Sequence, residues 1–188
     1  MAPVTLLGIA GSIRSGSFSA AILETLKAEV PEGVELTQHS LADVPLYNQD
    51  LDTDQPPAAV RSLRQAIAQA DGLVIVTPEF NYGMPGLLKN ALDWASRPYG
   101  ASCLIGKPVV TMSASPAFTG GVRAQAQLNE TLLATQSQLV VRSQVVIGEV
   151  HAKIVDGRLI ERSSLDFAAA AIGDLVRLIR ERSALEPA

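Results

Sequence analysis

The sequence predicts an α/β fold in which helices cover both faces of a parallel sheet of five strands. Short apolar runs alternate along the chain with segments whose apolar residues recur every three or four positions. The runs at 4–10 and 73–77 are apolar on both faces, as strands buried between two helix layers are. Because right-handed crossovers place the connecting helices on both faces, this alternation indicates a doubly wound sheet.

Each element is expected from its own pattern. Apolar runs between turn residues predict strands at 4–10, 34–38, 73–77, 109–112 and 139–141. Apolar residues on one helical face predict five helices, the first beginning near Ser17 and the others over 60–70, 87–95, 128–133 and 165–179. An irregular segment is expected through 45–48.

Composition narrows the class of protein. A chain of 188 residues fits one domain, 1–188, and 47% hydrophobic with 18% charged residues is typical of a compact α/β domain. A net charge of −4 gives no general attraction for nucleic acid or for an acidic membrane. No apolar run is long enough to span a membrane and no secretory signal is recognisable, so we expect a cytoplasmic protein.

The nine residues after the first predicted strand, 11–19, are rich in groups that bind anions. They contain four serines, two glycines and Arg14. Free backbone N–H groups and the helix dipole favour negative charge at a helix N-terminus. A phosphate group is therefore the expected occupant, and the alternative is a Ser/Gly-rich turn that only caps the helix.

Other phosphate-binding motifs do not fit this stretch. It lacks the Gly-Lys-Ser/Thr of a P-loop and the G-x-G-x-x-G of a dinucleotide fingerprint. The one cysteine, Cys103, lies far downstream, so no phosphatase nucleophile is present in the loop. The first strand ends without the acidic residues that would hold Mg²⁺.

Two further loops follow strand carboxyl ends, at 78–86 and 113–121, and both are rich in small and polar residues. In doubly wound sheets ligands bind at the carboxyl ends of the strands, where the strand order reverses. We therefore expect the three loops to converge on one crevice, with a phosphate at one end and a flat aromatic ring at the other. Flavin mononucleotide, FMN, fits that description.

Three motifs resemble those of the NAD(P)H-dependent FMN reductase family. They are Gly11-Ser12-Ile13-Arg14 with Ser17 following, the seventeen residues 78–94, and Gly106-Lys107-Pro108. The resemblance implies a flavodoxin-like fold and reduction of FMN-bound enzyme by NADPH or NADH. Quinones, free flavin, chromate or azo compounds are the small-molecule acceptors it implies.

The three loops and the resemblance together give the residues expected to contact the cofactor. They are Ser12, Arg14, Ser17, Phe18, Ser19, Pro78, Glu79, Phe80, Asn81, Tyr82, Gly83, Ser113 and Ser115. The resemblance assigns Ser12, Arg14, Ser17 and Ser19 to the phosphate, 79–82 to the border of the isoalloxazine ring, and Ser115 to the ribityl chain or ring edge. Ser19, Phe80 and Gly83 depart from the residues common in the family.

Two functions from different classes remain open on the sequence, beside a weaker third, a flavin-binding sensor or regulator. The first is an FMN-dependent oxidoreductase, which needs no catalytic side chain because hydride transfer occurs at the flavin. The second is a flavodoxin-like carrier of single electrons between protein partners. The mild charge of −4 and only eight aromatic residues (four Phe, three Tyr and one Trp) favour the enzyme.

The remaining expectations concern metals and assembly. His39 and His151 fall in no metal-ligand spacing, so no metal is expected. The resemblance implies a homodimer or homotetramer. The third predicted helix carries a mixture of side chains beside its apolar stripe that suits a subunit interface as much as water: Lys89, Asn90, Asp93, Trp94 and Arg97.

Overall fold

The centre of the protein is a parallel sheet, seen in a computed structural model that describes residues 3–185. Residues 1–2 and 186–188 of the predicted domain lie outside this range. The strands follow the order β2 (Val34–His39), β1 (Val4–Ala10), β3 (Gly72–Thr77), β4 (Pro108–Ala114) and β5 (Gln138–Leu139), and β6 (Val145–Ile147) also pairs with β4. Every pairing in this sheet is parallel. The predicted doubly wound, flavodoxin-like fold class is confirmed.

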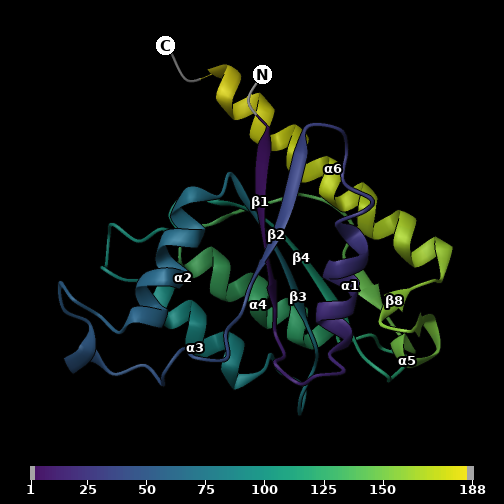
Figure 1. Ribbon diagram of the computed structural model, residues 1–188, viewed down its shortest axis with the longest axis horizontal. Helices are drawn as coiled ribbons and strands as arrows, with labels where there is room; N and C mark the ends of the chain where they lie inside the picture. Colours follow the sequence, from purple (N-terminus) through teal and green to yellow (C-terminus); the bar gives the residue numbers. More distant parts are fainter. Residues whose placement is uncertain (1–2, 186–188) are drawn as a thin grey trace.

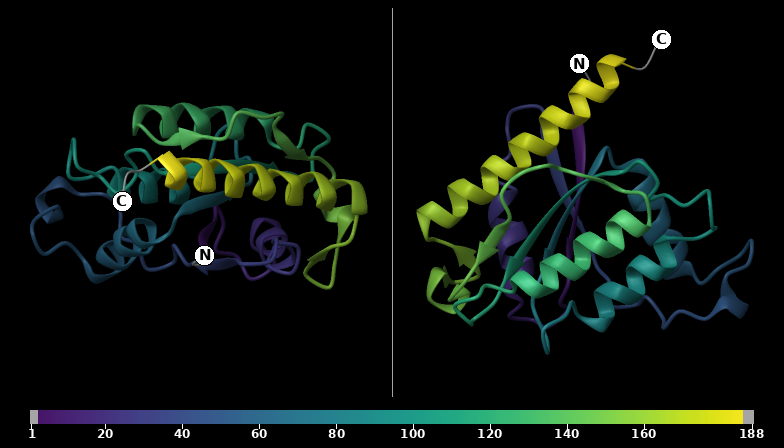
Figure 2. Two further views of the ribbon diagram at one scale, coloured as in Figure 1. Left: turned by 90° about the horizontal axis from the view of Figure 1, so that it is seen from above. Right: turned by 180° about the vertical axis from the view of Figure 1, so that it is seen from behind.

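Helices cover both faces of the sheet (Figures 1 and 2). The long ones are α1 (Phe18–Leu26), α2 (Ala58–Gln69), α3 (Gly86–Ala95), α4 (Val122–Ala134) and α6 (Arg162–Leu185). A 3₁₀ turn at Gln49–Leu51 and the one-turn helix α5 (Val150–Lys153) complete the helical elements of residues 3–185. No helix within that range is long and apolar enough to cross a membrane.

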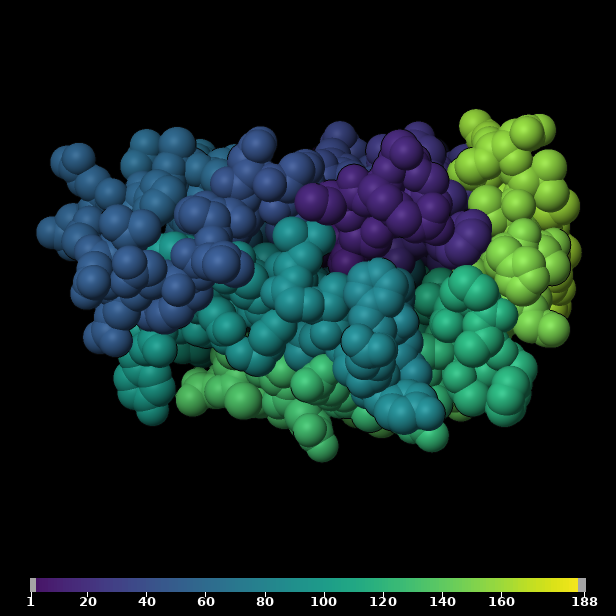
Figure 3. All heavy atoms as spheres, turned by 90° about the horizontal axis from the view of Figure 1, so that it is seen from below, coloured from purple at the N-terminus to yellow at the C-terminus, as the bar shows by residue number. Residues whose placement is uncertain are grey.

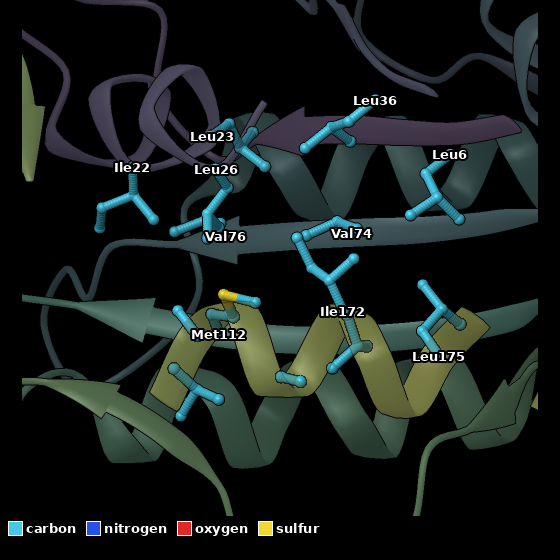
Figure 4. Close-up of a cluster of buried hydrophobic side chains, with 14 of the residues drawn as sticks. Leu6, Ile22, Leu23, Leu26, Leu36, Val74, Val76, Met112, Ile172 and Leu175 are labelled. Atoms are coloured by element: carbon cyan, nitrogen blue, oxygen red, sulfur yellow. The ribbon is translucent and has the colours of Figure 1, made fainter. Parts of the chain in front are cut away.

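The two faces of the central strands build two separate cores. Leu6 and Val74 pack with α1 and α6 on one face, whereas Leu7 and Ile75 pack with α2, α3 and α4 on the other. Figure 4 shows the first core, in which Ile172 of α6 faces the strands. Because neighbouring residues of a strand point to opposite faces, a strand buried on both sides needs apolar side chains on both, and β1 and β3 are apolar except for Thr5 and Thr77.

The fifth position of the sheet differs from the single strand predicted at 139–141. Two short strands share the edge of β4: β5 pairs with residues 108–109 and β6 with residues 112–114. Between them the Gln125 side chain of α4 reaches the strand, and its Nε2 donates to the Thr111 carbonyl at 2.9 Å. The polar residues 142–144 interrupt the apolar run, so no continuous strand can form there.

A small hairpin after α5 was not predicted. Strands β7 (Ile154–Val155) and β8 (Arg158–Leu159) are joined by Asp156 and Gly157, whose φ angles are 48° and 72°. Positive φ at both central residues is the type I′ geometry that Asp-Gly favours. The Leu159 N–H donates to Thr25 Oγ1 of α1 at 3.0 Å, which anchors the hairpin beside α1.

In α3, the third predicted helix, the position of Trp94 contradicts the expected role at a subunit interface. Trp94 is fully buried, and its Nε1 donates to the Pro45 carbonyl at 2.8 Å. Asn90 Nδ2 donates to the same carbonyl at 2.8 Å, and Asn90 Oδ1 accepts from the Tyr47 N–H at 2.7 Å. The polar face of α3 therefore holds the predicted irregular segment against the core, whereas Lys89 and Asp93 form an ion pair at the surface.

We predict that Asn90→Ala destabilises the fold, because it leaves the Tyr47 N–H and part of the Pro45 carbonyl unpaired in a half-buried place. An unsatisfied group costs about 1–3 kcal/mol, and urea denaturation would measure this loss in the free energy of unfolding. Lys89→Ala, one residue earlier on the same helix, is the control and should change stability by less than about 0.5 kcal/mol. Equal stabilities of the two variants would contradict this role of Asn90.

Candidate functional site

The three predicted loops meet at the edge where the parallel strands end (Figure 3). Figure 3 shows this edge, with the purple N-terminal loop between the teal loop after β3 and the yellow-green segment that contains the hairpin. A cavity of about 150 Å³ lies between the loops after β1, β3 and β4. Nine of the thirteen predicted site residues line it: Ser12, Arg14, Ser17, Phe18, Ser19, Pro78, Glu79, Phe80 and Ser115.

The first loop contributes the anion-binding end of the cavity. Ser17 is the N-cap of α1, and its Oγ accepts from the Ala20 N–H at 3.2 Å. Its hydroxyl proton is not used in that bond, so Ser17 can cap the helix and donate to a ligand at once. Ser17 therefore caps the helix, and this capping role is compatible with binding of an anion.

Free donors surround this cap. Within residues 3–185, the backbone N–H groups of residues 12–16 donate to no other group. The Arg14 guanidinium lies 4.7 Å from the centre of the Phe18 ring, a cation–π contact that holds the charge at the loop. Several backbone donors and one fixed positive charge thus face the N-terminus of α1, whose dipole also favours an anion.

The Ser19 hydroxyl is the most specific indication that the cavity binds a ligand. Its side chain is 1% exposed and lines the cavity, and its Oγ has no hydrogen-bond partner in the described structure. A buried hydroxyl without a partner costs about 1–3 kcal/mol. An anionic oxygen in the cavity would satisfy it, so the donor set fits a phosphate group.

The second loop forms a tight turn that reaches the solvent. Phe80 and Gly83 exchange two backbone hydrogen bonds of 3.0 Å, and Asn81 and Tyr82 at the tip have φ angles of 50° and 67°. The N–H groups of Phe80 and Gly83 therefore bond within the turn and are not free to donate to a flavin. Asn81, Tyr82 and Gly83 do not line the cavity, and the Tyr82 ring lies 4.2 Å from the Arg123 guanidinium.

Glu79 has a structural partner that the sequence analysis missed. Its Oε2 accepts from the N–H groups of Arg123 and Ala124 at 3.0 and 3.1 Å. Helix α4 begins after Gly121, which has no side chain to cap it, so Glu79 supplies the cap from another loop. Gln127 of α4 accepts from the Met84 N–H at 2.7 Å, and together these bonds fix the second loop on α4.

The third loop lines the cavity with Ser115 but not with Ser113. Ser115 Oγ accepts from the Ala117 N–H at 3.2 Å, which leaves its proton for a ligand. Ser113 is fully buried within β4, and its Oγ donates to Gln125 Oε1 at 3.2 Å. A Cβ on Gly120 would collide with Val146 of β6. The Gly120-Gly121 pair therefore allows close packing within the chain.

Titratable groups near the sheet offer little other chemistry. Burial raises the pKa of the Cys103 thiol above its usual value, and Cys103 does not line the cavity, so a reactive thiolate is disfavoured there. Burial also lowers the pKa of His39. Within residues 3–185, no group of three or more His, Cys, Asp or Glu side chains is placed to hold a metal ion.

We predict that Glu79→Ala removes the cap of α4 and lowers the free energy of unfolding by about 1–2 kcal/mol. The amides of Arg123 and Ala124 should also exchange their hydrogens faster, which NMR would detect residue by residue. Glu130→Ala, at an exposed position of α4, is the matched control. Unchanged exchange at both amides in Glu79→Ala would show that another group caps the helix.

Comparisons with known proteins identify the family. Residues 4–152 match the NADPH-dependent FMN reductase family. A quinone reductase of Escherichia coli (strain K12) is 37% identical over 184 residues, 94% of this chain and 96% of that protein. An NAD(P)H-dependent FMN reductase of Pseudomonas aeruginosa is 39% identical over 159 residues, 84% of this chain and 85% of that protein.

A solved structure supports the same assignment. The flavoenzyme NAD(P)H:(acceptor) oxidoreductase of Paracoccus denitrificans is 30% identical and superimposes with a TM-score of 0.84 over 95% of this chain and 98% of that one. These likenesses support an enzyme rather than an electron carrier between proteins. The chain belongs to the NADPH-dependent FMN reductase family and is an oxidoreductase that uses FMN and NAD(P)H.

Proposed function

We propose that this protein holds FMN in the cavity between the three loops and transfers electrons from NADPH or NADH to quinones. The observation that carries the proposal is the buried, unpartnered Ser19 hydroxyl beside the free amides of residues 12–16. These donors suit a phosphate at one end of a flavin. When bound, FMN supplies the two-electron redox chemistry of the reaction.

The side chains of the cavity have distinct tasks in this proposal. Arg14, Ser17 and Ser19 bind the phosphate through charge-assisted hydrogen bonds. Pro78, Phe80 and Ser115, which line the cavity, would border the ring. Phe80 is 58% exposed, so an apolar surface beside the ring remains open for a nicotinamide or a quinone to stack.

The choice of acceptor rests on the relatives. Besides the enzyme of Escherichia coli, a 2-hydroxy-1,4-benzoquinone reductase of Burkholderia sp. is 34% identical over 175 residues, 93% of this chain. A flat quinone suits the exposed aromatic residues around the cavity. Free flavin, chromate and azo compounds are further acceptors within the proposal.

Assembly and location are part of the same proposal. Exposed apolar side chains, among them Ile13, Phe80 and Phe118, stand on the loops around the site, and such clusters often mark interfaces between subunits. We place a single cytoplasmic FMN-binding domain, 1–188, in a homodimer or homotetramer. The net charge of −4 gives it no general affinity for nucleic acid.

The proposed activity can be tested by anaerobic titration. The visible absorbance of the FMN-loaded protein should bleach on addition of NADPH or NADH and recover when a benzoquinone is added. Protein that has been titrated with FMN but is reduced by neither nicotinamide would refute the proposal. The buffer with free FMN at the same concentration is the control, because it should bleach far more slowly.

We predict that Ser19→Ala and Arg14→Ala weaken FMN but not riboflavin, which lacks the phosphate. A hydrogen bond to a charged group contributes about 1.5–3 kcal/mol, so FMN affinity should fall about tenfold to a hundredfold in each variant. Calorimetric titration of both flavins closes a double-mutant cycle between each side chain and the phosphate.

Ser19→Ala should also have a characteristic effect on the free energy of unfolding. Its hydroxyl has no partner to lose in the flavin-free protein, so the free energy of unfolding should stay equal or rise. Ser17→Ala is the matched control, because it removes the cap of α1 and should lower stability by about 1 kcal/mol. Equal losses of FMN and riboflavin affinity in Ser19→Ala and Arg14→Ala would place the phosphate elsewhere.

A further inference from the structure

Two adjoining cavities lie at the opposite edge of the sheet, where the parallel strands begin. One, of about 530 Å³, is bounded by Pro3 and Val4 at the start of β1 and by the last turns of α6. The other, of about 280 Å³, lies between the end of α2, the start of β4 and the same helix. Asp71, Ile179 and Ser183 line both cavities. We call the two together the amino-edge groove, and Figure 1 shows α6 passing the start of β1 there.

The larger cavity has mainly apolar walls. Pro3, Val4, Ile179 and Ala184 line it, and Arg180 adds a positive charge. Val4 and Ile179 belong to the core between the sheet and α6, so the groove reaches that core from outside. An aliphatic chain that lies in this cavity would cover the exposed part of these apolar side chains, and removal of apolar surface from water favours binding.

The smaller cavity presents two cationic side chains. Lys107 Nζ donates to backbone carbonyls at the end of α2, and Arg182 Nη1 donates to the Gly106 carbonyl and, at 3.0 Å, to Gln138 Oε1. Because an ammonium has three hydrogens and a guanidinium five, both side chains keep donors for a ligand. Within residues 3–185, neither Lys107 nor Arg182 forms an ion pair with a carboxylate.

The charges of the smaller cavity do not balance. Burial lowers the pKa of the Lys107 ammonium, and the charge of Arg182 lowers it further against the opposing effects of Cys103 and Asp71. Asp71 is the one acidic residue among those that line the groove, and its Oδ2 accepts from the Thr5 N–H and hydroxyl at 2.7 and 2.9 Å. Lys107 and Arg182 against Asp71 leave one positive charge uncompensated, which suits a singly charged carboxylate better than a doubly charged phosphate.

We propose that the amino-edge groove binds a small carboxylate that carries an aliphatic chain. The carboxylate contacts Lys107 and Arg182, and the chain lies in the larger cavity beside Val4 and Ile179. No residue lines both this groove and the flavin cavity. The inference therefore goes beyond the proposed function, and the groove should bind its ligand with or without FMN.

Calorimetric titration of the full chain with octanoate, butanoate and 1-octanol tests both parts of the groove. Each buried methylene strengthens binding about fourfold, so octanoate should bind at least about tenfold more tightly than butanoate. Octanol has the same chain without the charge, and it should bind at least about tenfold more weakly than octanoate. Saturation with FMN should change the octanoate affinity by less than about twofold.

Two pairs of variants locate the binding site. Arg182→Gln keeps a donor for the Gly106 carbonyl but removes the charge, so it should weaken octanoate about tenfold. Its control is Arg177→Gln, on the same helix but outside both cavities. Ser183→Asp places a negative charge where the cavities meet, and it should weaken octanoate about three- to tenfold at low salt. Ser183→Asn, which has nearly the same shape without the charge, is its control.

The Ser183 pair decides if Arg182→Gln fails to fold, because Ser183 is exposed. No measurable binding of octanoate, or equal binding of octanoate and butanoate, would refute the inference. So would octanol that binds as tightly as octanoate, or variants that do not differ from their controls. If octanoate displaces FMN, it occupies the flavin cavity, so the groove inference is wrong and the proposed function stands.

Discussion

The burial of both faces of the central strands is the constraint on which the rest of the structure depends. Strands β1, β3 and β4 present apolar side chains in both directions, so each needs a helix layer on either side. Right-handed crossovers supply those layers, and they also bring every strand-to-helix loop to the same edge of the sheet. The convergence of loops from three distant parts of the chain is thus a consequence of core burial.

Once the loops meet, hydrogen bonds within the chain decide which donors remain for a ligand. The second loop uses the N–H groups of Phe80, Gly83 and Met84 to fold on itself and to bind α4. The first loop uses only the Ser17 N–H among residues 12–17, and its amides stay open. Rigid support on one side and unsatisfied donors on the other are what an anion site requires, since a preformed site loses little entropy on binding.

The sequence allowed the fold and the first loop to be predicted because both depend on local patterns. Buried strands, amphipathic helices and a Ser/Gly-rich helix start are visible within a few residues of one another. The roles of Glu79 and Gln125 were not predictable in this way, because each acts on an element more than ten residues away. Glu79 lines the cavity, and its carboxylate also caps helix α4, which begins at Val122 after Gly121. Likewise, the burial of Asn90 and Trp94 depends on where the segment at 45–48 crosses α3.

The hairpin shows how an element too short to predict can shape a site. Two strands of two residues each have little stability alone, and here the Thr25 hydroxyl and the burial of Leu159 hold them beside α1. Thr25 also donates to the Ala21 carbonyl at 2.8 Å, so the same side chain links a turn of α1 to the hairpin beside it. One hydroxyl with two partners therefore ties the hairpin to the helix. The hairpin thereby becomes one wall of an open cavity of about 470 Å³ beside α1, to which it contributes Ile154 and Gly157.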